Sequence, residues 1–321
     1  MSMNSWVCCT DNSHTFSKQD AEQNGYFCPK CPYGESILVN AQGSNNVSTT
    51  QGSSTSPALP AFAPQEDLGL AILLLDCSGS MKGSAFPQHP TSKRDLIAKS
   101  VSAGIFSLSG NPLREFAYVL IIGFDHEIDV LLPYTSIQEI VNQYKDAAGL
   151  EQMLREKMSK KEGATDINQA LSVAFNFTQQ FINSSITALG NYKPRIQAVL
   201  DDNMQSHQIP NVRVLLFSDG EHYLGEDNRT LNPSPFKNLQ YNGKVFDLLM
   251  SAYYGNSGDN GYYQLKSLVS KCPRHPIQDQ FFLFDDPSKV ANLKGLFRMA
   301  SGASGFCPLC LAESGTAVRD N

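Results

Sequence analysis

The sequence lacks the features that would assign it to a membrane, to secretion or to nucleic acid. Residues 1–9 do not show a basic region followed by an apolar run, so no signal peptide is expected. No stretch approaches the roughly 18 apolar residues of a membrane span. The net charge of −6 and the pI near 5.5 give no bulk electrostatic reason to expect nucleic-acid binding. These absences predict a cytoplasmic protein with no membrane span.

Signatures of common catalytic sites are also missing. The chain has no phosphate-cradling loop, no G-x-S-x-G, no H-E-x-x-H and no paired general base. We therefore predict that the protein is not an enzyme. What it does have is a hydrophobic fraction of 41% with 18 Phe and 12 Tyr, which is enough for a packed core.

Composition divides the chain into four zones. Residues 1–38 hold four Cys and the one Trp but little apolar material, so they need a staple such as a metal. Residues 39–66 are rich in Ser, Asn, Gly and Thr and then in Pro and Ala, which predicts a flexible linker. Residues 67–301 alternate strand and helix patterns, and residues 302–321 form a Cys-containing tail.

The alternation in 67–301 predicts an α/β fold with a mostly parallel, doubly wound sheet covered on both faces. Ligands of such sheets bind outside the carboxyl ends of the strands. We expect strands at 68–75, 116–124, 128–133, 212–217, 245–254 and 281–284, with a hairpin at 125–127. Helices are expected at 92–108, 137–147, 165–181, 262–270 and 288–300.

Three short, oxygen-bearing clusters fall at expected strand ends or helix starts. Asp76, Ser78 and Ser80 follow the first strand, Thr165 opens a strong helix, and Asp219 follows the 212–217 strand. Carboxylates and hydroxyls are hard ligands that suit Mg²⁺, with Mn²⁺ or Ca²⁺ as alternatives. Helix capping is the simpler reading of the first cluster, but it does not account for Thr165 and Asp219.

The D-x-S-x-S pattern, the Thr of G-A-T-D and the Asp of F-S-D-G resemble the metal-ion-dependent adhesion site (MIDAS) of von Willebrand factor A (VWA) domains. The resemblance covers about 67–301 and implies a Rossmann-like VWA domain. It further implies that Asp76, Ser78, Ser80, Thr165 and Asp219 hold the cation directly or through water. An Asp or Glu of a partner protein would complete the coordination, with Asp125 and Asp166 as supporting residues nearby.

The cysteines suggest zinc, because two C-P-x-C pairs in an intracellular chain indicate metal rather than disulfides. Cys28 and Cys31 form the first pair, and the remaining ligands are sought among Cys8, Cys9 and His14, with Cys8 and Cys9 as alternatives. Surface thiols are the competing interpretation. A VWA-like domain joined to zinc-ribbon elements makes this chain resemble the bacterial tellurium-resistance-associated VWA proteins.

A second zinc site is predicted from Cys272, His275, Cys307 and Cys310, because the preceding helices both return to the amino-terminal edge of the sheet. Two rival arrangements stay open. One pairs Cys28 and Cys31 with Cys307 and Cys310 and leaves His275 on the surface, and the other buries Cys272 in the core. In either case the zinc would be structural and would lie opposite the MIDAS-like face.

The function predicted from these features is a metal-dependent adaptor or scaffold that binds a protein partner. A metal-assisted hydrolase is the first alternative; His222, three residues after Asp219, would be its acid or base, although we expect a solvated loop position for it. Nucleic-acid binding through the zinc ribbon is the second alternative. The charges disfavour it, because residues 1–38 offer Lys18 and Lys30 against Asp11, Asp20, Glu22 and Glu35.

Overall fold

The structure is a computed structural model. It describes residues 5–8, 13–17, 19–20, 38–40, 69–86, 90–110, 114–115, 117–182, 211–225, 229–237, 240–241, 244–245, 249–272, 275–286 and 307–309. The predicted helix at 288–300 lies outside these residues. None of the described helices is long and apolar enough to cross a membrane.

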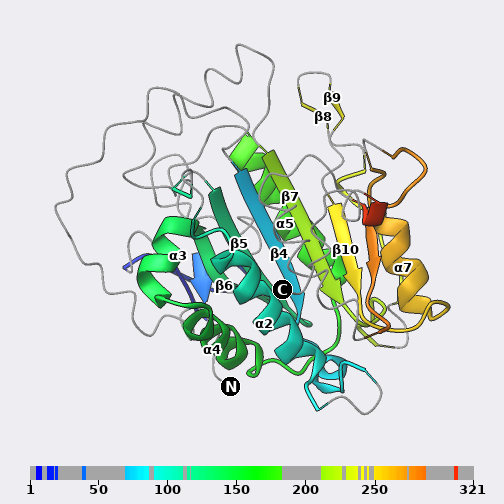
Figure 1. The fold of residues 1–321 in the computed structure, drawn as a ribbon, viewed down its shortest axis with the longest axis horizontal. Coiled ribbons are helices and arrows are strands. Elements are labelled where there is room, and N and C mark those ends of the chain that lie inside the picture. Colours follow the sequence, from blue (N-terminus) through cyan, green and yellow to red (C-terminus); the bar gives the residue numbers. More distant parts are fainter. Residues whose placement is uncertain are drawn as a thin grey trace.

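A six-stranded sheet forms the centre of the molecule, in the order β11-β10-β7-β4-β5-β6 (Figure 1). Its strands are β4 (Gly69–Asp76), β5 (Ala117–Phe124), β6 (Ile128–Ser136), β7 (Asn211–Ser218), β10 (Leu249–Tyr253) and β11 (Phe281–Leu283). Every pairing is parallel except β5 with β6, which forms the predicted hairpin. Numbered along the chain, the strands follow the order of doubly wound nucleotide-binding sheets, so the predicted α/β fold class is confirmed.

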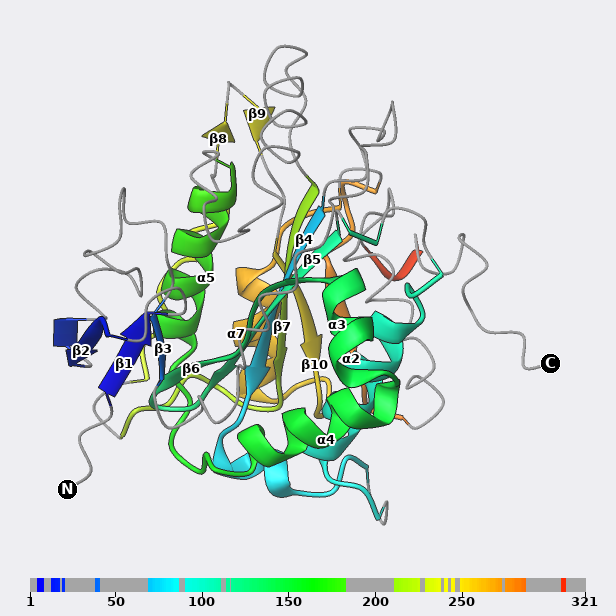
Figure 2. The same cartoon turned by 90° about the vertical axis from the view of Figure 1, so that its left-hand side faces the viewer.

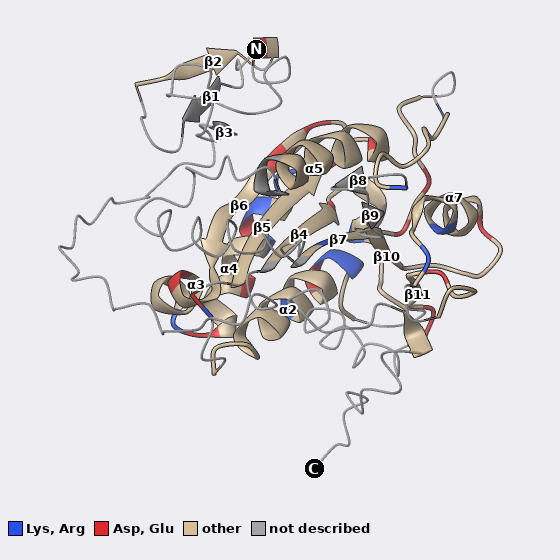
Figure 3. Cartoon of the chain, turned by 90° about the horizontal axis from the view of Figure 1, so that it is seen from above, with Lys and Arg blue, Asp and Glu red and all other residues tan. Residues whose placement is uncertain are grey.

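Helices cover both faces of this sheet (Figures 2 and 3). The helices α2 (Lys93–Phe106), α3 (Ile137–Tyr144) and α4 (Ala147–Met158) pack on one face. The helices α5 (Ile167–Ile182) and α7 (Asn260–Leu268) pack on the other. The helix α4 was not predicted from the sequence.

The central strand β4 shows why the sequence reads as a continuous apolar run. Leu70, Ile72 and Leu74 belong to the cluster under α5 and α7, whereas Leu73 and Leu75 belong to the cluster under α2 and α4. A strand of a parallel sheet is buried on both faces, so the residues that point to either face are apolar. The run stops being apolar at Asp76, where the strand ends.

Local capping fixes where the helices on the α2 face begin. Ser92 accepts a hydrogen bond from the N–H of Asp95 at the start of α2, and Ser136 forms a reciprocal capping box with Glu139 at the start of α3. Asp146 accepts from the N–H of Gly149 and begins α4. The chain therefore ends α3 and begins α4 within a few residues. From the sequence, this region was predicted to be one helix, 137–147, followed by a loop.

Two small sheets accompany the main one. The strands β1 (Ser5–Cys8), β2 (Thr15–Ser17) and β3 (Leu38–Asn40) form an antiparallel sheet in the order β2-β1-β3. Phe16 packs against the core cluster beneath α5, and β3 lies against β6. The strand β3 includes the first two residues of the predicted linker. The pair β8 (Gln240–Tyr241) and β9 (Lys244–Val245) precedes β10, which begins four residues later than predicted.

Candidate metal centre

The predicted oxygen ligands come together at the point where the strand order reverses, between β4 and β7. Asp76 is the last residue of β4 and Ser218 the last residue of β7, and the two strands pair in parallel up to Leu75 and Phe217. In doubly wound sheets, ligands bind in the crevice at the point where the strand order reverses. The loops that follow β4 and β7 border this position.

A chain of hydrogen bonds connects four of the five predicted ligand residues, and Ser218 takes part in it. Oδ1 of Asp76 accepts from the N–H of Ser78 at 2.8 Å, and Oδ2 accepts from Oγ of Ser218 at 2.5 Å. The hydroxyls of Ser78 and Ser80 lie 3.1 Å apart. Ser80 then donates to Oδ1 of Asp219 at 2.7 Å. The loops after β4 and β7 are thus bonded to each other through the groups that would face a cation.

Thr165 reaches the same region through its backbone. It forms an antiparallel bridge with Tyr223, in which each N–H donates to the other's carbonyl at 2.9 Å. Two residues earlier, the carbonyl of Gly163 accepts from the N–H of Gly79 at 3.3 Å. The loop before α5 is therefore tied to both other loops, with Thr165 buried between them.

Arg94, which the sequence analysis did not single out, holds two of these loops together. Its Nη2 donates to the carbonyls of Cys77, Ser78 and Lys161 at 2.7, 3.2 and 3.0 Å. The side chain is buried, so these carbonyls have their bonds inside the protein. Its position in the first turn of α2 gives no signal in the sequence, because the three acceptors are backbone atoms.

Asp125 organises the loop that carries Thr165. Its Oδ2 accepts from the N–H of Gly163 at 2.9 Å, and its Oδ1 accepts from Nζ of Lys161 at 3.0 Å. Burial alone would raise the pKa of Asp125, but the Lys161 ammonium and the N–H groups of Glu127 and Gly163 lower it overall. Asp125 therefore ties the segment from Lys161 to Gly163 to the hairpin between β5 and β6.

Asp166 lies at the start of α5 and also supports the site from the side. Its Oδ1 accepts from the N–H of Gln169 at 2.9 Å, and its own N–H donates to the carbonyl of Asp125 at 2.8 Å. The second bond joins the loop before α5 to the hairpin between β5 and β6. Both predicted supporting residues thus act on the backbone around Thr165.

The donor set fits a hard divalent cation. Asp76 is fully buried, Ser78 and Thr165 are nearly so, and the side chain of Asp219 is 1% exposed. Burial and the nearby charge of Asp219 raise the pKa of Asp76 to about 6. Two buried carboxylates that repel each other call for a compensating positive charge, and all donors here are oxygen atoms, the ligands that Mg²⁺ prefers. Ser80 is exposed, so the site opens to solvent on that side.

A positive charge of the chain itself already lies beside Asp219. Nζ of Lys93, the first residue of α2, is 2.5 Å from Oδ2 of Asp219. Oδ1 of the same carboxylate accepts from Ser80, so the two oxygens of Asp219 face different partners. This pair was not predicted from the sequence, because 126 residues separate its members.

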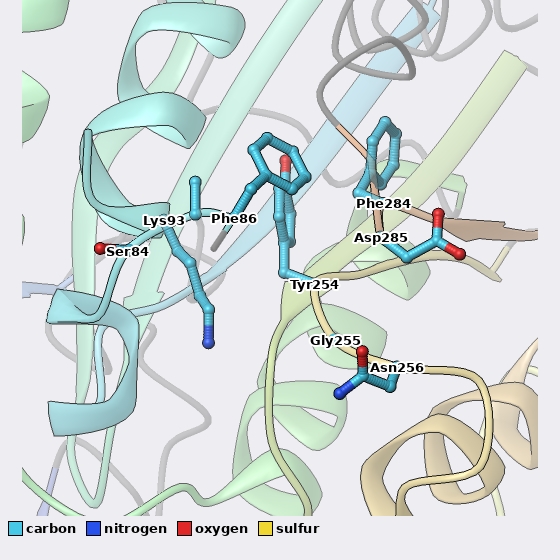
Figure 4. A pocket seen from close by; sticks show the side chains of 9 residues that line it. Ser84, Phe86, Lys93, Tyr254, Gly255, Asn256, Phe284 and Asp285 are labelled. Carbon is cyan, nitrogen blue, oxygen red and sulfur yellow. The ribbon is translucent and has the colours of Figure 1, made fainter. Parts of the chain in front are cut away.

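Lys93 also lines a pocket of about 290 Å³ next to the crevice (Figure 4). The walls include the buried aromatic side chains of Phe86, Tyr254 and Phe284, the last two stacked with ring centroids 5.2 Å apart. Asn256 and Asp285 contribute polar groups from the loops after β10 and β11. The pocket therefore offers apolar and polar contacts beside the oxygen cluster.

The solvated loop position that was expected for His222 is wrong. His222 is fully buried. Its backbone N–H donates to Oε1 of Gln264, and its Nε2 lies 3.1 Å from Nδ2 of Asn168. Cys77 is also buried, and burial raises the pKa of its thiol far above the ordinary value. Neither residue is exposed for acid–base or nucleophilic chemistry.

The predicted zinc ligands are described only in part. Cys8 ends β1 and His14 directly precedes β2, while Cys9, Cys28 and Cys31 lie outside the described residues. Of the second set, Cys272, His275 and Cys307 come together with their ligand atoms all within 4.8 Å of one another. Cys310 lies outside the described residues. Cys272 is buried, as the second rival arrangement expected, but it lies in a small cluster with Cys307 apart from the two large cores. His275 lies beside Cys307, whereas the first rival arrangement left it on the surface.

Comparisons with models of protein families and with curated protein sequences find no match. Among solved structures, the chain is similar to proximal thread matrix protein 1 from the mussel byssus, with 11% identity and a TM-score of 0.39 over 73% of this chain and 46% of that one. It is similar to the PilB minor pilin from Streptococcus sanguinis, with 13% identity and a TM-score of 0.39 over 73% and 61%. The vWF domain of the pilus tip protein Mfa5 from Porphyromonas gingivalis aligns at 14% identity and a TM-score of 0.37, over 79% and 98%. At these values no residue role is transferred to this chain.

Proposed function

We propose that this protein is a metal-dependent protein-binding adaptor whose site at the ends of β4 and β7 holds Mg²⁺. The observation that carries the proposal is the hydrogen-bonded oxygen cluster of Asp76, Ser78, Ser80 and Asp219 at the switch point of the sheet. Its carboxylates are buried while Ser80 is open to solvent. Such a site keeps the ligands in place and leaves one side of the cation for an external group.

The external group in this proposal is a carboxylate of a partner protein. A hard cation takes oxygen ligands, and an Asp or Glu side chain supplies an anionic one. When bound, Mg²⁺ would supply the positive charge that draws this group to the crevice. The adjacent pocket, with its aromatic walls and its polar rim, would contact the residues that flank the partner's carboxylate.

Binding is favoured over hydrolysis because the described residues around the crevice offer little proton-transfer machinery. His222 was the candidate acid or base, and it is fully buried with Nδ1 at 3.8 Å from Asp166. Lys93, the nearest cationic side chain, is engaged with Asp219. Among the described residues, neither His222 nor Lys93 is placed to act as a general base, which suits reversible coordination.

The test uses short fluorescent peptides that contain one Asp or Glu, compared with the same peptides carrying Asn or Gln. Fluorescence anisotropy with the full chain, dialysed and then supplied with Mg²⁺, is expected to show binding of acidic peptides only. Binding should disappear without Mg²⁺ and in Asp76→Asn, and should persist in Glu156→Gln, whose exposed carboxylate lies on α4, outside both the oxygen cluster and the pocket. Equal binding of acidic and amide peptides, or binding unaffected by Mg²⁺, would sink the proposal.

A further inference from the structure

A cluster of sulfur and nitrogen ligands lies at the opposite end of the sheet from the oxygen cluster. In Figure 1 the segment 307–309, in red, is near the upper end of β10, whereas the cyan loop after β4 is at the bottom. The loop 269–280 connects α7 to the start of β11 at this same end. Cys272 and His275 lie in this loop, and Cys307 arrives from a segment more than thirty residues further along the chain.

The loop is built so that Cys272 and His275 face the same point. Lys271 and Asp279 form an antiparallel bridge and an ion pair at 2.6 Å, which closes the base of the loop. Inside it, the N–H of Cys272 donates to the carbonyl of Gln278 at 2.9 Å, and the N–H of Gln278 donates to the carbonyl of His275 at 2.8 Å. These bonds fix the backbone on both sides of a C-x-x-H pair, a spacing that lets both side chains reach one ion.

The distances between the ligand atoms match those of one tetrahedral zinc ion. Nδ1 of His275 lies 3.3 Å from Sγ of Cys307 and 3.9 Å from Sγ of Cys272. Zinc bonds of about 2.3 Å to sulfur and about 2.0–2.1 Å to nitrogen, at tetrahedral angles, separate the two ligand atoms by about 3.6 Å. The two measured distances lie on either side of this value.

The burial of the two thiols supports the same conclusion. Cys272 is 1% exposed and Cys307 is fully buried, yet they form a cluster of their own instead of joining either apolar core. Thiol groups gathered with an imidazole are a metal-binding arrangement, whereas an inert buried Cys packs among apolar side chains, as Cys77 does.

We propose that Cys272, His275 and Cys307 bind a structural Zn²⁺ that fastens the segment 307–309 to the loop before β11. The role is to tie a segment distant in sequence to the edge of the sheet, where β11 pairs, among the described strands, with β10 alone. The sequence-based prediction adds Cys310 as the fourth ligand; the proposal rests on the three described residues. This zinc is separate from the proposed Mg²⁺ site, so either proposal can fail without the other.

The experiment must separate this zinc from any ion at the N-terminal cysteines. It uses the full chain with Cys8, Cys9, Cys28 and Cys31 replaced by Ser, purified without added metal. Elemental analysis is expected to find one zinc per chain. X-ray absorption at the zinc edge should then show both sulfur and nitrogen ligands.

In the same background, Cys272→Ser and Cys307→Ser are each expected to remove the zinc. His275→Gln should also lose it, and His275→Cys should retain it, because a thiolate can replace an imidazole as ligand. Cys77→Ala is the control for loss of a buried thiol and should keep one zinc. The proposal is overturned if the background chain binds no zinc, if zinc persists in Cys272→Ser and Cys307→Ser, or if mass spectrometry shows a Cys272–Cys307 disulfide.

Discussion

Nζ of Lys93 lies 2.5 Å from Oδ2 of Asp219, so an ammonium of the chain occupies one side of a carboxylate that would bind the cation. The pair is mostly shielded from solvent, with the lysine side chain 20% exposed and the aspartate 1%. The structure therefore places an internal positive charge in competition with the divalent ion that we propose for this site.

Replacement of this lysine should strengthen cation binding. In Lys93→Met the repulsion between the ammonium and Mg²⁺ is removed and Oδ2 of Asp219 is released, and we expect affinity to rise by about tenfold, or about 1.4 kcal/mol. Isothermal titration calorimetry with Mg²⁺ measures it. Lys82→Met, which removes an exposed lysine paired with Glu162, is the matched control and should change the affinity little. Weaker binding in Lys93→Met would show that the lysine supports the site.

The buried carboxylate of Asp76 should destabilise the metal-free protein at neutral pH. Its pKa is about 6 in the fold because of burial and the charge of Asp219, above about 3.9 for an unfolded chain. The folded state therefore binds more protons between these values, and its stability falls as pH rises from about 4 to about 6. A shift of this size corresponds to about 3 kcal/mol at pH 7.

The variant Asp76→Asn removes the buried charge and keeps an acceptor for the N–H of Ser78. Urea unfolding without divalent ions should show Asp76→Asn to be about 1–3 kcal/mol more stable than the wild type at pH 7.5, with little difference at pH 4.5. Added Mg²⁺ should stabilise the wild type alone. A less stable Asp76→Asn at pH 7.5 would contradict this assignment.

Arg94 should affect both stability and cation binding, although its hydrogen bonds go to backbone carbonyls. In Arg94→Lys a shorter, non-planar head cannot bond the carbonyls of Cys77, Ser78 and Lys161 together. We expect a loss of about 2–3 kcal/mol in the free energy of unfolding, because buried carbonyls lose a charged donor. Mg²⁺ affinity should fall as well, because the loop after β4 and the loop before α5 are no longer held together.

The control for this variant is Arg114→Lys, which changes a half-buried arginine that bonds Gln138 and the carbonyl of Ser109, away from the crevice. It should leave Mg²⁺ affinity as in the wild type. Thermal unfolding and calorimetry on both variants give the two quantities separately. Unchanged Mg²⁺ binding in Arg94→Lys would mean that the loops hold their geometry without this residue.

Gly261 of α7 should also affect cation binding, because it packs against the loop after β7. A Cβ at Gly261 would lie 2.9 Å from the backbone carbon of Gly220, which directly follows Asp219. The clash is with backbone, so the loop after β7 must move, even though alanine is the better helix former by about 1 kcal/mol. Gly261→Ala should weaken Mg²⁺ binding, as measured by calorimetry. Gly110→Ala, where the added Cβ meets no atom within 4 Å, should not.

Hydrophobic pattern was enough to predict the fold class and most of its elements. The apolar run of β4 and the spacing along α5 each follow from burial, which the sequence records directly. The helix α4 was missed, although Leu150, Leu154 and Met158 repeat every four residues and are fully buried. Its cap, Asp146, comes two residues after α3 ends, so the two helices read as one helix and a loop.

The candidate oxygen ligands were predictable because each follows a strand or opens a helix, and strand ends of a parallel sheet meet at one edge. The residues around them were not. Lys93 and Arg94 act across long sequence distances, on a carboxylate and on backbone carbonyls. The burial of His222 depends on Gln264 and Asn168, which pack over it only in the folded chain. Such contacts leave no periodic trace in the sequence.

The central claim is that the oxygen cluster binds a hard divalent cation, and Mn²⁺ offers the most direct measurement because it substitutes for Mg²⁺ at oxygen sites and is paramagnetic. Titration of the full chain, followed by the electron paramagnetic resonance signal of free Mn²⁺, should show one Mn²⁺ site. Mg²⁺ should compete for this site, and replacement of the candidate zinc-binding cysteines should leave it intact. The double variant Ser78→Ala, Ser80→Ala and the single variant Asp219→Asn should abolish it, while Asp285→Asn should not. Wild-type protein that leaves all Mn²⁺ free, or variants that bind as well as the wild type, would contradict the account.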